Sequence, residues 1–325
     1  MIWQEVPSEN PADADAFLRH WAPDLGIWSF GALRPGLLSL VQQMNIPMTL
    51  VDAAEDGFEE GRWKWLPDLS RATLRQFTSI LAVSANAAKI LRKLGASDEQ
   101  LSISGPLQDG TVALPCNEPD REKMMTHLAG RPVWLAAHVQ ADELDIVLTA
   151  HRAAQRGAHR LLLILLPADP DSLEDVAVEL AGRNLTCANW TMGDWPGDHT
   201  QVLLATAKED LGLWHRVSPI SFMASSLLPG YGGIDPYPAA ALGSAVLYGA
   251  HIGRYLSAYS RLARAGAARI VRDQDTLAAA VTRLTAPDQA AAMALSAWEL
   301  LSEGAEVTDT LVDTLLDQLD RAEVA

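Results

Sequence analysis

The segment from Arg160 to Leu166 reads RLLLILL and is the feature that most constrains the fold. A short, continuous apolar run of this kind is typical of a buried strand. Strands that are apolar on both sides belong in parallel sheets, because helices cover both faces of such sheets. The segment therefore predicts an α/β fold with a parallel sheet.

Short apolar runs alternate with helical segments along the rest of the chain, which is the pattern of an open α/β sheet. In the first third this pattern predicts about four strands, at 25–28, 48–51, 80–83 and 101–104, with helices at 36–44, 70–77 and 85–94. Further on it predicts a helix at 142–156 and strands at 132–137, 160–166, 202–205, 220–224, 245–248 and 268–271.

The stretch 110–120, GTVALPCNEPD, separates two such series. It lacks periodicity and contains Pro115 and Pro119, so we interpret it as a linker. The sequence thus predicts a domain at 1–112, a second domain at 121–305 and a C-terminal segment at 306–325. In that last segment a helix is expected to carry one apolar stripe, which makes it a candidate to pack back on the first domain. The stripe consists of Leu311, Leu315, Leu316 and Leu319.

Charge narrows the range of partners. The chain has 41 acidic and 25 basic residues and a formal net charge of −16, so its average field repels nucleic acids and anionic membrane surfaces. No run of eighteen apolar residues occurs, and the N-terminus, MIWQEVPSENPADAD, is polar. We therefore expect a cytoplasmic protein without a transmembrane anchor.

The two cysteines, Cys116 and Cys187, lie far apart and have no metal-ligand spacing. Both are interpreted as reduced, buried, small hydrophobic residues. No paired histidines or phosphate-binding motif such as a Walker loop occur either. The sequence therefore predicts neither a metal site nor a bound cofactor.

The segment from Leu228 to Gly249, LPGYGGIDPYPAAALGSAVLYG, combines a glycine-rich turn, a small-residue helix and a short apolar strand. Its first glycines let the backbone take positive φ and approach a ligand closely. Pro236 suits a first helical turn, and Gly243 suits the end of the helix. This order predicts free backbone N–H groups at a helix start, where an anion binds without a basic side chain. The alternative is an ordinary loop between a strand and a packed helix.

Four segments carry a family resemblance in the same order along the chain. They are WAPDLGIW with RPGLLSLVQQMNIPMTLVDA, then VWLAA with DELDIVLTAHRAA, then LLLILLPADPDSL, and finally AKEDLGLWHRVSPISFMASSLLPGYGGIDPYPAAALGSAVLYGAHIGRY. Together they resemble the 3-deoxy-D-manno-octulosonic acid (Kdo) transferases, GT-B glycosyltransferases that move Kdo from its cytidine monophosphate conjugate to lipid A precursors. The resemblance spans nearly the whole chain and implies two Rossmann-like parallel-sheet domains, the N-terminal one truncated.

The resemblance also implies a donor site for a nucleotide sugar of the CMP-Kdo type in the second domain, within lipopolysaccharide-type glycan synthesis. The acceptor is not implied. The candidate donor-site residues, which lie in or beside the matched loops, are His138, Lys208, Asp210, Ser225, Ser226, Gly230, Gly232, Gly233 and Asp235.

The donor loop departs from the family pattern, Gly-Gly-His-Asn-Pro-Leu-Glu-Pro. Pro238 replaces the glutamate that is expected to bind the nucleotide ribose, and Asp235 replaces the asparagine. A carboxylate beside a donor phosphate adds like-charge repulsion. The chain therefore resembles a shortened, motif-degenerate member of the family.

Three further loops differ as well. After Leu166, where the family has an arginine suited to phosphate, the chain reads PADPDS and has no cation. In the loop before LGLW, Lys208 is the nearest cation, and its alternative role is that of a solvated surface lysine. After VWLAA, His138 and Asp142 form an acid–base pair if their side chains meet; the alternative is that Asp142 caps the following helix.

No catalytic base can be assigned from the sequence. The family's general-base glutamate belongs to an N-terminal part that has no counterpart in this chain, and Asp24 and Asp52 are more typical of caps or turns. Two functions follow. The first is a Kdo-transferase-like glycosyltransferase with altered specificity; the second is a catalytically silent relative that acts as a binding or assembly protein. In both cases the shortened N-terminal sheet is expected to expose an edge that a second copy or another protein covers.

Overall fold

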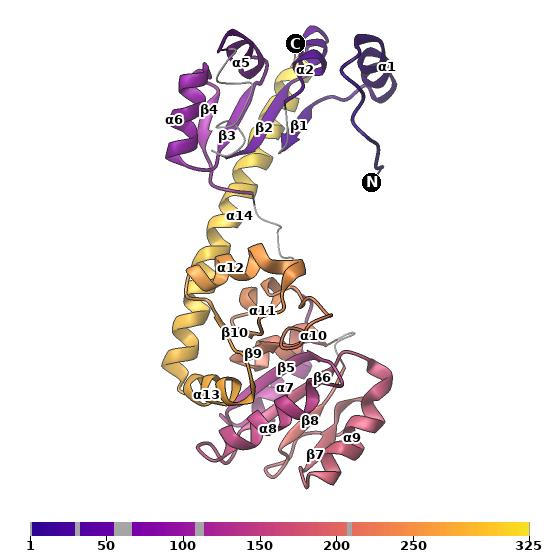
Figure 1. Cartoon of the computed structure of the whole chain (residues 1–325), viewed down its shortest axis with the longest axis vertical. Helices are drawn as coiled ribbons and strands as arrows, with labels where there is room; N and C mark the ends of the chain where they lie inside the picture. The colour runs from indigo at the N-terminus through magenta and orange to yellow at the C-terminus, as the bar shows by residue number, and fades with distance from the viewer. Residues whose placement is uncertain (1, 30–32, 55–66, 108–113, 207–209, 325) are drawn as a thin grey trace. The chain divides into compact units, whose positions relative to one another are not determined.

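The computed structural model describes residues 2–29, 33–54, 67–107, 114–206 and 210–324 (Figure 1). The chain divides into two compact units. One comprises Met1–Gly110 with Ser302–Ala325, and the other comprises Thr111–Leu301. We call them the four-stranded unit and the seven-stranded unit after their sheets. Both sheets are parallel throughout their described strands, so the fold is the α/β, GT-B-like class that the sequence predicts.

The four-stranded unit has the strand order β1-β2-β3-β4, with β1 at Gly26–Ser29, β2 at Met48–Ala53, β3 at Ser79–Ala82 and β4 at Leu101–Ile103. The strands predicted for the first third are therefore confirmed. The described helices of this unit before residue 110 are α1 (Pro11–Trp21), α2 (Pro35–Gln43), α5 (Pro67–Leu74) and α6 (Ala85–Leu94). Helix α6 shows the local signals that set such bounds, because the Ser84 hydroxyl accepts the Ala87 N–H and Gly95 ends the helix at φ 110°.

The seven-stranded unit has the order β11-β10-β9-β5-β6-β8-β7. Its strands are β5 (Val133–Val139), β6 (Leu162–Pro167), β7 (Cys187–Asn189), β8 (Val202–Leu204), β9 (Ile220–Met223), β10 (Ala245–Tyr248) and β11 (Ala268–Ile270). Its helices are α7 (Glu118–Leu128), α8 (Leu144–Gln155), α9 (Leu173–Gly182), α10 (Leu211–Val217), α11 (Tyr237–Ala241), α12 (Leu256–Arg264) and α13 (Gln274–Leu284), with 3-10 turns η1 (Pro170–Ser172), η2 (Trp190–Met192) and η3 (Gly253–Tyr255).

Helices cover both faces of this sheet, as Figure 1 shows. Alternate residues of β5 belong to different cores: Trp134 packs in the core that includes residues of α8 and α13, and Leu135 in the core that includes residues of α7 and α10. Leu163 and Leu162 of β6 divide in the same way. The apolar run at 160–166 is thus a strand buried on both faces, as predicted.

The structure differs from the sequence predictions in the start of α7, in strand β7 and in the exposure of Cys187. Helix α7 begins at Glu118, inside the predicted linker, because Pro119 lies in its first turn, where the missing N–H costs nothing. Strand β7 was not predicted. It is the edge strand of the sheet, which explains why Cys187 is exposed rather than buried.

The C-terminal helix is also longer than predicted, since α14 runs from Pro287 to Val324 and so begins well before the segment 306–325. Its early residues Ala290 and Ala297 are buried in the cores of the seven-stranded unit. Its later residues belong to the four-stranded unit, where Leu311 packs with Val51 and Leu81.

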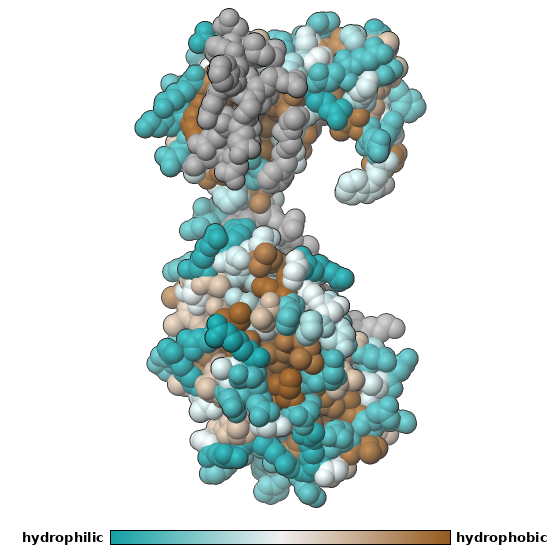
Figure 2. Space-filling view, in the orientation of Figure 1, coloured by the Kyte–Doolittle hydropathy of each residue, from teal (hydrophilic) through white to brown (hydrophobic). Residues whose placement is uncertain are grey.

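No helix among the described residues is both long and apolar enough to span a bilayer. On the face shown in Figure 2, hydrophobic patches alternate with hydrophilic residues.

Candidate functional site

The order of strands in the seven-stranded unit singles out one corner. From β5 the chain crosses to β6 on one side, and it later returns to β9 on the other side of β5. The loops that leave the carboxyl ends of β5 and β9 therefore diverge. In open parallel sheets, ligands bind outside the carboxyl ends of the strands at such a switch point. We call residues 138–143, at and after the end of β5, and residues 224–233, after β9, the switch corner.

Two residues of this corner have strained backbones. His138 has φ 64° and Ser225 has φ 58°, a left-handed conformation that is uncommon outside glycine. The Ser225 hydroxyl donates to the His138 carbonyl at 2.8 Å, and the Gln140 amide donates to that hydroxyl at 2.9 Å. Strain of this kind costs about 1–3 kcal/mol per residue and is concentrated at functional sites. The hydrogen bonds between the two loops hold both residues in place.

The same contacts assign a tautomer to His138. Its Nδ1 lies 3.1 Å from the Ser225 hydroxyl oxygen. Because the single proton of that hydroxyl is donated to the His138 carbonyl, Nδ1 must be the donor in this contact. Neutral His138 therefore carries its proton on Nδ1 and presents Nε2 as an acceptor.

Buried Glu143 organises the loop after β9. Its carboxylate accepts three successive backbone N–H bonds, from Ser225 at 2.6 Å, Ser226 at 3.0 Å and Leu227 at 2.8 Å. Successive N–H groups that point the same way form an anion-binding concavity. In this chain, the Glu143 carboxylate occupies that concavity.

A third loop joins the corner from the end of β10. The Gly249 N–H donates to the Ser226 hydroxyl at 2.7 Å, and the His251 N–H donates to the Ser226 carbonyl at 2.8 Å. A Cβ on Gly249 would lie 2.1 Å from that carbonyl oxygen, so only glycine fits. The segments at the ends of β5, β9 and β10 thus meet at two adjacent residues, Ser225 and Ser226.

The glycine-rich turn begins immediately after this pair. Gly230 has φ 108°, and nothing lies within 4 Å of the Cβ position built on it. Gly232 lies beside Arg254 of η3, whose backbone N–H donates to the Gly232 carbonyl at 3.3 Å. The Gly233 N–H donates to the Ser225 carbonyl at 2.8 Å. The structure thus brings together six of the predicted donor-site residues at the switch corner: His138, Ser225, Ser226, Gly230, Gly232 and Gly233.

The predicted anion site at the start of the following helix is wrong. Helix α11 has only five residues. The N–H of its first residue, Tyr237, donates to the Asp235 carboxylate at 2.9 Å, and Pro238 has no N–H to offer. Asp235 thus acts as a local cap, and the start of this helix does not present the row of free donors that the sequence suggested.

Other sequence predictions separate in space. His138 and Asp142 do not pair, since the Asp142 carboxylate accepts the Tyr231 hydroxyl at 2.9 Å. Asp142 does not cap α8 either, because Glu143 holds that position. Asp210 accepts the Trp190 indole N–H at 2.9 Å after β8, a strand separated from β5 by β6. Lys208 lies outside the described residues.

Sequence reasoning missed several residues of this site, namely Gln140, Glu143, Gly249 and Arg254. Glu143 offered a signal, because it is an acid directly after a buried strand and its loop. Arg254 is an exposed cation that forms no ion pair within the described part of the chain. Within the same part, no group of three or more His, Cys, Asp or Glu side chains is placed to hold a metal ion.

Comparison with known proteins finds similarity to the 3-deoxy-D-manno-octulosonic acid transferases. A model of the 3-deoxy-D-manno-octulosonic-acid transferase (kdotransferase) family matches residues 2–109. The 3-deoxy-D-manno-octulosonic acid transferase of Haemophilus influenzae is 25% identical over 97% of this chain and 74% of its own length. That of Bordetella pertussis is 28% identical over 97% of this chain and 74% of its own length. The chain spans 58% of the Rickettsia bellii transferase.

Among solved structures, the C-terminal CMP-Kdo binding domain of WaaA from Acinetobacter baumannii matches with a TM-score of 0.53 and 21% identity. The match covers 57% of this chain and 99% of that domain, which supports a shared fold. The family model covers the first third of this chain, and the relatives align along nearly all of it. By these similarities, the chain resembles the 3-deoxy-D-manno-octulosonic acid transferases along nearly its whole length.

Proposed function

We propose that this protein is a Kdo-transferase-like glycosyltransferase that binds a nucleotide-activated sugar at the switch corner and transfers the sugar to an acceptor hydroxyl. The observation that carries the proposal is the bonded pair of left-handed residues, His138 and Ser225, at the point where the strand order reverses. Lipopolysaccharide-type glycan synthesis is the context that the relatives suggest.

The surroundings of the pair suit a nucleotide phosphate in two respects. The turn at Gly230 leaves open space beside the backbone, so a ligand can approach closely. Arg254, next to Gly232, supplies a cation in a protein whose net charge is −16. Both features lie on loops held by the rigid sheet, where binding residues are commonly found.

Calorimetric titration of cytidine monophosphate tests this proposal. In Ser225→Gly, the left-handed backbone is accessible to glycine and the hydroxymethyl side chain is lost, so nucleotide affinity is expected to fall roughly fivefold to tenfold. Asn184→Gly is the matched control, because Asn184 is also left-handed at φ 54° but is exposed after α9. The absence of heat at millimolar nucleotide, or equal affinity in Ser225→Gly, would contradict the proposal.

A second function, a catalytically silent relative that serves as a binding or assembly protein, has its own support. The three successive N–H groups of residues 225–227 are already occupied by Glu143. The helix start that follows offers no row of free donors, because Asp235 and Pro238 remove them. A sugar-transfer assay separates the two functions. Turnover above that of a variant lacking residues 229–233 would exclude the silent protein.

The four-stranded unit suggests a protein partner. Strand β1 is an edge strand that pairs only with β2 among the described strands, and its Ile27 side chain is 48% exposed. Open edges of this kind invite further strand pairing. We infer that a second copy of the chain or another protein covers β1. A strictly monomeric species by light scattering at high concentration would rule out the second copy.

A further inference from the structure

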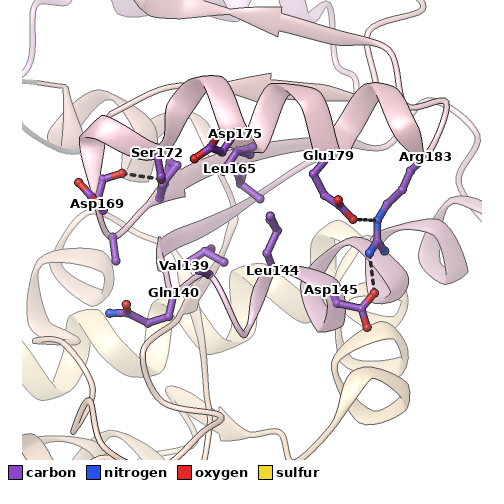
Figure 3. A pocket seen from close by; sticks show the side chains of 14 residues that line it. Val139, Gln140, Leu144, Asp145, Leu165, Asp169, Ser172, Asp175, Glu179 and Arg183 are labelled. Carbon is purple, nitrogen blue, oxygen red and sulfur yellow. Dashed lines mark hydrogen bonds and ion pairs between the residues drawn. The ribbon is translucent and has the colours of Figure 1, made fainter.

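A pocket of about 480 Å³ opens next to the switch corner, at the carboxyl ends of β5 and β6 and between α8 and α9 (Figure 3). Gln140 is part of its wall, and the amide of the same residue donates to the Ser225 hydroxyl at 2.9 Å. The pocket and the switch corner therefore share a wall. A ligand bound at the corner can extend into the pocket without crossing the sheet.

The inner lining of this pocket is apolar. Leu165 of β6 and Val139, the last residue of β5, are buried, and Leu144 of α8 and Val176 of α9 line the sides. Apolar walls with a few polar groups at the rim are typical of small-molecule sites. Such walls suit the C–H face of a sugar ring, while Gln140 and Ser172 provide hydrogen-bonding groups.

The charge of the lining decides what kind of group fits. Four carboxylates line the pocket, from Asp145, Asp169, Asp175 and Glu179, against one guanidinium, that of Arg183. These charges leave a formal excess of three negative charges. Figure 3 shows that Arg183 is already engaged, because it contacts Asp145 at 2.6 Å and Glu179 at 2.7 Å.

The remaining two acids are Asp169, in the loop after β6, and Asp175, one turn before Glu179 on α9. One Asp169 oxygen accepts the Asp171 N–H at 3.0 Å, and the Asp175 carboxylate forms no ion pair among the described residues. Both side chains are exposed at the rim, where a ligand can reach them. A ligand carboxylate or phosphate placed there would face like charges at short range, whereas an ammonium group would be attracted.

We propose that this pocket binds the amino group of an amino sugar and excludes sugars that carry a carboxylate. The role of the pocket as the sugar-binding part of a donor or acceptor site rests on the proposed function. Its ability to bind an amine does not depend on that function. The apolar lining receives the ring, and the Asp169 and Asp175 carboxylates receive the ammonium group. In this respect the chain differs from a protein that binds an acidic sugar in the corresponding pocket.

Titration of the ¹⁵N-labelled full chain with glucosamine, glucose and glucuronate, followed by NMR, tests the pocket with three sugars of similar size and different charge. Glucosamine is expected to shift amide signals of residues 139–145 and 168–183, with affinity about threefold to fivefold higher than that of glucose, the upper range for one partly exposed ion pair. Glucuronate is expected not to bind.

Two variants locate the effect. Asp175→Asn is expected to lower glucosamine affinity about threefold to fivefold and to leave glucose unchanged. Glu174→Gln is the matched control, since the neighbouring Glu174 is exposed and does not line the pocket. The inference is overturned if glucuronate binds as well as glucosamine, if glucosamine does not bind, or if Asp175→Asn leaves its affinity unchanged. A separate titration with cytidine monophosphate reports on the switch corner, so the two proposals fail independently.

Discussion

The Glu143 carboxylate accepts the backbone N–H of Ser225 at 2.6 Å, across 82 positions of sequence. The same carboxylate accepts the next two N–H groups of the chain. One buried side chain from the loop after β5 thus fixes the backbone of the loop after β9. The strained conformation of Ser225 depends on this contact, because it sets the direction of the backbone where β9 ends.

Replacing Glu143 by glutamine is expected to destabilise the seven-stranded unit by about 2–3 kcal/mol, since one accepting oxygen becomes an NH₂ group facing backbone N–H donors. The urea midpoint of unfolding measures this loss. Glu174→Gln makes the same chemical change at an exposed position and is expected to leave the midpoint unchanged. Equal midpoints for the two variants would show that the carboxylate is dispensable.

Gly249→Ala is expected to destabilise the same unit by about 2 kcal/mol or more, because the new Cβ would lie 2.1 Å from the Ser226 carbonyl oxygen. Gly182→Ala provides the comparison. Gly182 is the last residue of α9, and a Cβ there meets nothing within 4 Å, so this change should be neutral or slightly stabilising. Thermal melting of both variants measures the difference. A Gly249→Ala protein as stable as Gly182→Ala would contradict the close packing.

Two buried histidines predict acid sensitivity. Burial lowers the pKa of His151 to about 3 and that of His215 to about 4, from a usual value of 6.5. The unfolded chain therefore binds protons before the folded chain does, and stability falls as pH drops from 6.5 towards 4. Each histidine contributes about 1.4 kcal/mol per pH unit in that interval.

Urea midpoints measured between pH 7 and pH 4 test this dependence. The Nδ1 atom of His215 contacts the Ser221 hydroxyl at 3.0 Å, while its Nε2 is buried without a described partner. His215→Asn removes one titrating group, so its midpoint should depend less steeply on pH than that of the wild type. An unchanged slope would mean that His215 does not contribute.

Gln318 of α14 links the C-terminal helix to the four-stranded sheet. Its buried amide nitrogen donates to the hydroxyls of Thr49 and Ser79, both at 3.0 Å. Gln318→Ala leaves these hydroxyls without that partner and is expected to cost about 1–3 kcal/mol. Faster amide hydrogen exchange in residues 305–320 measures the effect. Asp317→Ala, at an exposed neighbour, serves as control, and equal exchange in both variants would contradict the prediction.

The sequence predicted the fold well because its signals are local. The apolar run at 160–166 and the alternation of strand and helix segments are set by neighbouring residues, and the structure contains these elements with small shifts of their ends. The clearest errors came where local signals compete. Pro119 reads as a breaker in a sequence, but in the first turn of α7 it starts a helix.

The candidate site was predictable only in part. Glycine spacing and the family resemblance indicated residues 225–233, because close backbone approach demands particular residue types. They did not indicate that Asp235 caps the short helix α11 or that His138 bonds to Ser225 rather than to Asp142. Those outcomes depend on the directions of side chains from three separate loops.

The sequence by itself determined a parallel α/β protein with a glycine-rich turn after a central strand, and a resemblance to the Kdo transferases. Only the tertiary structure decided that Glu143 fills the row of amides at 225–227 and that acids surround the pocket beside Gln140. The physical reason is that periodicity and turn chemistry act over a few residues. Hydrogen bonds and charge, in contrast, act between groups that only the folded sheet brings together.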